Sequence, residues 1–117
     1  MFKFSLAGRD WHWPKITARV LTVLRDQCGL DLRGLLRKDS EPTALALQDD
    51  ELVRKAFLIL CAGQIQTSGL SHDDIEEGWD GDVNQAARES LVEAFFTFSQ
   101  GPKKAAIVME RMRAAGQ

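Results

Sequence analysis

Two histidines are the first residues of this 117-residue chain whose type could support metal or acid–base chemistry. His12 lies between two tryptophans, and His72 lies in a separate polar stretch. Neither has a His, Cys or Glu at helical spacing with which it would share a metal ion. The pattern predicts an exposed strand position for His12 and a surface position at a helix start for His72.

A second candidate is the acidic turn at residues 80–84, with the sequence DGDVN, which carries the first three oxygen-bearing positions of a calcium loop. The sixth position is Gln85 instead of glycine, and the twelfth is Leu91 instead of the glutamate that binds calcium through two oxygens. Helix capping by Asp80 or Asp82 explains the turn better.

Four acidic side chains follow His72, and on a helix they form a solvated face more simply than a catalytic carboxylate pair: Asp73, Asp74, Glu76 and Glu77. The sequence shows no phosphate-binding glycine loop, serine nucleophile elbow or cysteine–histidine pair. Cys28 and Cys61 lie in apolar helical contexts, which is typical of buried free thiols in a reducing cytoplasm. We therefore predict no catalytic residue, no metal site and no cofactor, and a protein that is not an enzyme.

The composition is that of an ordinary globular domain, with 44% hydrophobic and 27% charged residues and a net charge of −2. This balance favours neither nucleic acid nor an anionic membrane. The longest apolar run, residues 56–63, is much shorter than the ~20 residues that span a bilayer. Charge is unevenly placed, because residues 41–82 hold two basic and ten acidic side chains. The acidic middle either complements basic segments, within the fold or between subunits, or is a set of solvated helix faces.

The chemistry-bearing residues must be positioned by a hairpin and helices. Large apolar and polar residues alternate at the N-terminus, with a turn expected over residues 7–10. A β-hairpin over residues 1–14 follows, with Trp11 and Trp13 on one side. Because two strands alone are marginally stable in water, we expect the hairpin to pack on helices, with its tryptophans against a helix over residues 16–28.

Helical spacing predicts a bundle of four to six helices over residues 15–117. The fold class is therefore mainly α, with an N-terminal β-hairpin packed on this bundle in a single domain, residues 1–117. The expected segments are a helix over 16–28 ended by Gly29, a turn near 30–36, a short helix after Pro42, a central helix over 50–68, an acidic helix ended by Gly78, a phenylalanine-rich helix ended by Gly101, and a last helix over 102–115.

The phenylalanine-rich helix carries two apolar faces. Its main stripe is expected to face the core and comprises Val83, Ala87, Leu91, Ala94, Phe95 and Phe98. A smaller ridge of Val92 and Phe96 either packs on the last helix or under the hairpin, or docks a partner's helix. Met109 and Met112 offer the same choice between a core edge and an adaptable groove. The candidate partner contacts are thus Val92, Phe96, Met109 and Met112.

The order of short motifs resembles that of tail assembly chaperone-like proteins of long-tailed bacteriophages and prophages. The matching positions are Trp11 or Trp13 in the hairpin, Gly29-Leu30-Asp31-Leu32, Asp49/Asp50 through Leu52-Val53 to Ala56, Cys61 and Gln64, Gly69-Leu70-Ser71-His72-Asp73-Asp74, Gly81-Asp82 with Ala86, Leu91 shifted by one place, Glu93-Ala94-Phe95 and Phe98-Ser99, and Pro102-Lys103-Lys104-Ala105-Ala106. The chain departs from the family pattern at residues 97–100, where two phenylalanines followed by prolines are more usual.

The resemblance implies a non-enzymatic assembly factor in the cytoplasm of the bacterial host. Such a factor binds the tape measure protein during tail morphogenesis, with the tail tube protein and a second copy of the chain as further partners, and with neither nucleic acid nor membrane. Two alternatives stay open. One is a minor virion component such as a connector or tube-end protein, and the other is a small phage-encoded regulator of a host protein.

Overall fold

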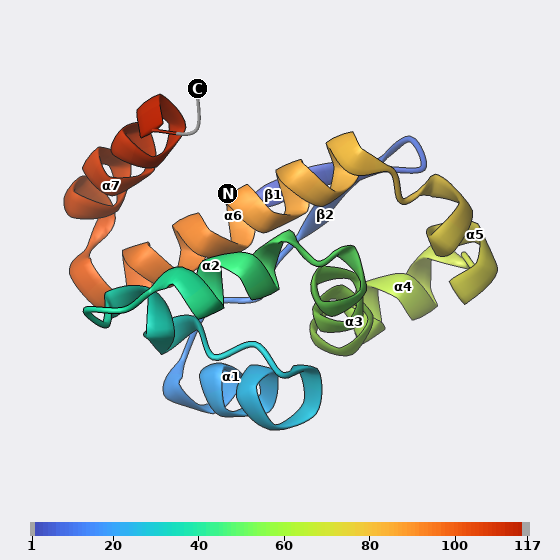
Figure 1. The fold of residues 1–117 in the computed structure, drawn as a ribbon. Coiled ribbons are helices and arrows are strands. Elements are labelled where there is room, and N and C mark those ends of the chain that lie inside the picture. The colour runs from blue at the N-terminus through green and yellow to red at the C-terminus, as the bar shows by residue number, and fades with distance from the viewer. Residues whose placement is uncertain (1, 116–117) are drawn as a thin grey trace.

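A computed structural model describes residues 2–115, in which a two-stranded hairpin packs against seven α-helices (Figure 1). The predicted fold class, mainly α with an N-terminal hairpin on a helical bundle, is confirmed. The elements in chain order are β1 (Lys3–Leu6), β2 (Arg9–His12), α1 (Ala18–Val23), the π-helix η1 (Leu24–Cys28), the 3-10 helix η2 (Leu32–Leu36), α2 (Glu41–Gln48), α3 (Asp50–Leu60), α4 (Ala62–Ser68), α5 (His72–Gly78), α6 (Gly81–Gln100) and α7 (Pro102–Ala115).

The hairpin turns in only two residues. Leu6 pairs with Arg9 across the antiparallel ladder, so Ala7 and Gly8 alone form the turn. The expected turn over residues 7–10 is wrong at its C-terminal half. Ala7 and Gly8 both have positive φ, 54° and 74°, as in the type I′ turn whose twist matches that of the strands. The strand therefore resumes at once.

The hairpin buries one aromatic face against α3 and α6. Trp11 contacts Phe57 of α3 with ring centroids 5.1 Å apart. The indole Nε1 of Trp13 donates to the main-chain carbonyl of Ala87 in α6 at 3.0 Å. The prediction that both tryptophans share one side is confirmed by their burial. These contacts come from α3 and α6, and packing of the tryptophans against the helix expected over residues 16–28 stays a prediction.

The helix expected over residues 16–28 begins at Ala18, after Thr17 accepts a hydrogen bond from the main-chain N–H of Val20. It continues as the π-helix η1 and ends where Gly29 adopts the left-handed conformation, φ 73°, as predicted. The next segment, η2, packs closely on α2. A Cβ at Gly34 would lie 1.9 Å from the hydroxyl oxygen of Thr43, so a larger residue there would force the Thr43 side chain to shift.

The single helix expected over residues 50–68 is two helices, because the backbone leaves helical geometry at Cys61 (φ −105°, ψ 19°). Contacts with the hairpin accompany the break. The Cys61 thiol and the Gln64 side-chain amide both donate to the carbonyl of His12, at 3.4 and 2.6 Å. Gln64 also accepts from the N–H of His12 at 3.1 Å. The amide thus pairs with β2 as a neighbouring strand would.

The longest helix of the described chain is α6, which crosses the molecule beside the hairpin (Figure 1). Asp80 caps it by accepting from the N–H of Val83 at 2.9 Å. Gly101 (φ 87°, ψ 161°) ends it in a backbone region that only glycine adopts readily. The chain then folds back, and α7 packs on α6 from Pro102 onward. The predicted boundaries at Gly101 and Pro102 are confirmed.

Substitution of Ala7 by Asn should stabilise the fold. Ala7 holds a positive φ that costs energy for alanine, and Asn-Gly is the preferred pair of a type I′ turn. We expect Ala7→Asn to raise the free energy of unfolding by about 0.5–1 kcal/mol in urea titrations. Gly8→Ala, the control, should lower it, because φ at Gly8 is also positive. A loss of stability in Ala7→Asn would contradict the assigned turn.

Candidate interaction surface

Asn84 and Ser90 are the buried polar residues of the described chain, and both accept hydrogen bonds from tryptophan. The Trp79 indole donates to Asn84 at 3.1 Å, and the Trp13 indole donates to Ser90 at 2.9 Å. Trp11 donates to a main-chain carbonyl at 3.0 Å. Among residues 2–115, no buried side-chain nitrogen or oxygen lacks a partner.

The sequence pattern placed Asn84 in a calcium-like turn and gave no role to Ser90, so neither was expected as a buried partner of tryptophan. A signal was available for Asn84, because it lies seven residues before Leu91 on the same face of α6 as buried apolar residues. A polar residue on such a face requires a buried partner, and tryptophan is a common donor.

The histidines and the acidic turn occupy the positions expected of them. His12 is exposed on β2, and His72 is the exposed first residue of α5. Asp80 caps α6, and Asn84 points inward to Trp79, so the calcium-like segment is used for structure. Within residues 2–115, no group of three or more His, Cys, Asp or Glu side chains converges as metal ligands would.

The acidic cluster begins with a capping box formed by Ser71 and Asp74. The Ser71 hydroxyl accepts from the N–H of Asp74 at 3.1 Å, and the Asp74 carboxylate accepts from the N–H of Ser71 at 2.9 Å. Hydrogen bonds from the Ser71 backbone and side chain lower the pKa of Asp74. The other acidic side chains of the cluster are exposed, as a solvated face would be.

The four candidate partner contacts divide between the interior and the surface. Val92, Phe96 and Met109 are 2%, 5% and 4% exposed, so the monomer itself covers them. Of the two interpretations of the ridge on α6, packing inside the protein is the one observed. Met112 is 43% exposed and remains available to a partner.

The expectation that Phe98 faces the core with the rest of the main stripe is wrong. It points to the same side of α6 as buried residues, yet it is 47% exposed because the last turn of the helix extends past the core. Five large apolar side chains are exposed in the described chain: Leu36 (49%), Leu45 (57%), Phe98 (47%), Ile107 (50%) and Met112 (43%). They come from η2, α2, the end of α6 and α7. We call these five residues the apolar set.

A groove of about 520 Å³ lies between α6 and α7 near the end of α2. The residues that line it are Gln48, Gln85, Arg88, Glu89, Val92, Met109, Met112 and Arg113. Three of the four candidate partner contacts therefore meet in one groove, and Phe96 does not line it. Arg88 and Arg113 contribute two positive charges from facing helices.

A second cavity of about 390 Å³ lies between β2 and α4 and was not anticipated. It is lined by Arg9, Asp10, Trp11, Gly63, Gln64, Thr67 and Ser68. Its carboxylate is already engaged, because Asp10 accepts from the Ser5 hydroxyl at 3.0 Å and lies 3.5 Å from the Lys3 ammonium. These contacts lower the pKa of Asp10. The groove between α6 and α7 is thus the stronger candidate for binding.

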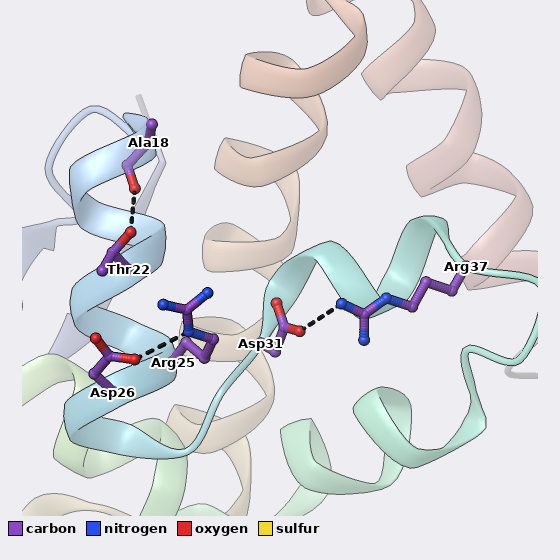
Figure 2. A network of polar contacts seen from close by, with 6 residues as sticks. All are labelled: Ala18, Thr22, Arg25, Asp26, Asp31 and Arg37. Carbon is purple, nitrogen blue, oxygen red and sulfur yellow. Dashed lines mark hydrogen bonds and ion pairs between the residues drawn. The ribbon is translucent and has the colours of Figure 1, made fainter.

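Basic side chains of the N-terminal helices have acidic partners nearby. Figure 2 shows Arg25 paired with Asp26 at 3.0 Å and Arg37 paired with Asp31 at 2.9 Å. The same view shows the Thr22 hydroxyl bonded to the Ala18 carbonyl one turn earlier. These positive charges are therefore partly neutralised within their own segments.

Comparison of the chain with protein-family models, with curated proteins and with solved structures gives no match. No helix among residues 2–115 is long and apolar enough to cross a membrane.

Cys61 should be inert in the native protein. Burial raises the pKa of its thiol from 9.0 to about 12. The thiolate fraction at pH 8 is then lower by about a thousandfold than in the unfolded chain. We expect iodoacetamide to label Cys61 in guanidinium but not in buffer, as followed by mass spectrometry of the peptides. The associated stability is complete below pH 9 and is lost as the pH rises toward 12. Equal labelling in both states would contradict this burial.

Proposed function

We propose that the chain is a non-enzymatic interaction protein of the tail assembly chaperone kind, which binds the tape measure protein in the bacterial cytoplasm during tail morphogenesis. The observation that carries the proposal is the apolar set, because these five large apolar side chains stay exposed in the monomer and a protein partner can cover them. The order of motifs along the chain, which resembles that of this family, supplies the identity of the partner.

The structure supports a reversible association. The exposed side chains of the apolar set are separate residues on four elements, each about half exposed. A permanent subunit contact buries a continuous apolar surface that resembles a domain core cut in half. An assembly chaperone must release its client, and a partner that covers scattered half-exposed side chains dissociates more readily.

Co-expression with the tape measure protein of the same phage or prophage tests the proposal. We expect a complex that co-purifies with the tagged chain. Replacement of Leu45 and Phe98 by serine should reduce the co-purified tape measure protein several-fold. Because both side chains are about half exposed, the free energy of unfolding should change by only about 0.5 kcal/mol per substitution.

Gln66→Ala is the matched control, since Gln66 is exposed on α4, away from the apolar set. It should leave the yield of complex unchanged. Absence of any complex with the unmodified chain would refute the proposal. Mass spectrometry of purified particles separates it from the alternative of a minor virion component, because a chaperone should be missing from the particles.

A further inference from the structure

The positive charges of the groove between α6 and α7 lack acidic partners in the described chain. The ion pairs formed within residues 2–115 involve Lys3, Arg25, Arg37 and Arg54, and none involves a basic residue of α6 or α7. Helix α7 carries four basic residues and one acidic residue: Lys103, Lys104, Arg111, Arg113 and Glu110. The groove itself holds Arg88 and Arg113 against Glu89, which leaves one net positive charge.

The acidic residue of the groove is already engaged. The Glu89 carboxylate accepts a hydrogen bond from the side-chain amide of Gln85 at 3.3 Å, one turn earlier on α6. Arg88 on the α6 wall and Arg113 on the α7 wall therefore remain available to an external anion. Two cations on facing walls favour a ligand that presents carboxylates on both sides of its bound face.

The apolar part of the groove is formed by Val92, Met109 and Met112. The first two are buried at its base, and Met112 is 43% exposed at its surface. Methionine side chains are flexible and polarisable, so they fit apolar groups of varied shape. An apolar side chain that enters the groove would cover Met112 and gain the free energy of its burial.

We propose that this groove binds an acidic amphipathic segment of the protein partner, with an apolar side chain on Met112 and carboxylates on Arg88 and Arg113. The inference rests on the proposed function, in which the partner is the tape measure protein. A nucleic acid fits less well, because the residues that line the groove include no aromatic ring for base stacking and do include Glu89.

Fluorescence anisotropy with synthetic peptides and the full chain tests the proposal. The probe is a labelled amphipathic peptide of about 15 residues, with leucines on one helical face and glutamates beside them. Two comparison probes have the same leucines beside lysines, and glutamates without leucines. We expect the leucine–glutamate peptide to bind most tightly, and its affinity to fall as salt rises.

Variants of the groove should weaken that binding. Arg88→Glu and Arg113→Glu each replace an attraction by a repulsion, and we expect each to lower the affinity about tenfold. The double variant should prefer the lysine peptide. Arg19→Glu is the matched charge control, because Arg19 is exposed on α1. Met112→Ser should weaken binding, whereas Ala106→Ser, at an exposed residue of α7 outside both the groove and the apolar set, should not.

The inference is overturned if the glutamate and lysine peptides bind equally, if the groove variants bind like Arg19→Glu, or if a labelled oligothymidine binds more tightly than the leucine–glutamate peptide. These outcomes are distinct from failure of the proposed function. Peptide binding without a tape measure complex would refute only the identity of the partner. A tape measure complex that is indifferent to Arg88→Glu and Arg113→Glu would refute only the groove.

Discussion

The packing of four aromatic rings around Phe57 is the constraint on which the rest of the structure depends. The ring of Phe57 is fully buried, with centroids 5.4 Å from Phe4, 5.1 Å from Trp11, 6.2 Å from Trp13 and 5.5 Å from Trp79. These rings come from both strands, from the chain after β2 and from the chain before α6. Since two strands are marginally stable alone, the hairpin owes its stability to this cluster.

The same cluster explains why two polar residues of the described chain are buried. Each tryptophan brings an indole N–H into the interior, where an unpaired donor costs about 1–3 kcal/mol. Asn84 and Ser90 of α6 satisfy two of them, so the buried polar residues serve the fold. The side chains proposed to contact a partner lie outside the core. They are the apolar set and the two arginines of the groove. Under the proposed function, the residues that hold the fold together and the residues that contact a partner are thus different, which suits a releasable binding protein.

Local signals predicted the element boundaries well, and long-range contacts decided what they missed. Helix boundaries at Gly29, Gly101 and Pro102 follow from the backbone preferences of glycine and proline themselves. The sequence was therefore enough to predict these boundaries. The break at Cys61 accompanies bonds to His12, 49 residues away in the chain, which no local pattern encodes. The exposure of the candidate contact residues was predicted only in part, because it too depends on long-range packing. A helical wheel groups Val92 with Phe96 and places Phe98 in the core stripe, but it does not show where neighbouring helices end. In the folded chain Val92 and Phe96 are buried, whereas Phe98, near the end of the helix, is left exposed.

The central claim is that interior phenylalanine maintains the fold while exterior phenylalanine is free for contact. Equilibrium urea unfolding of Phe57→Leu and Phe98→Leu applies the same chemical change to both sites. We expect Phe57→Leu to lower the free energy of unfolding by about 1–3 kcal/mol, because all four aromatic contacts of Phe57 are altered. We expect a change within about 0.5 kcal/mol for Phe98→Leu. Equal losses at the two positions, or a larger loss at Phe98, would contradict the claim.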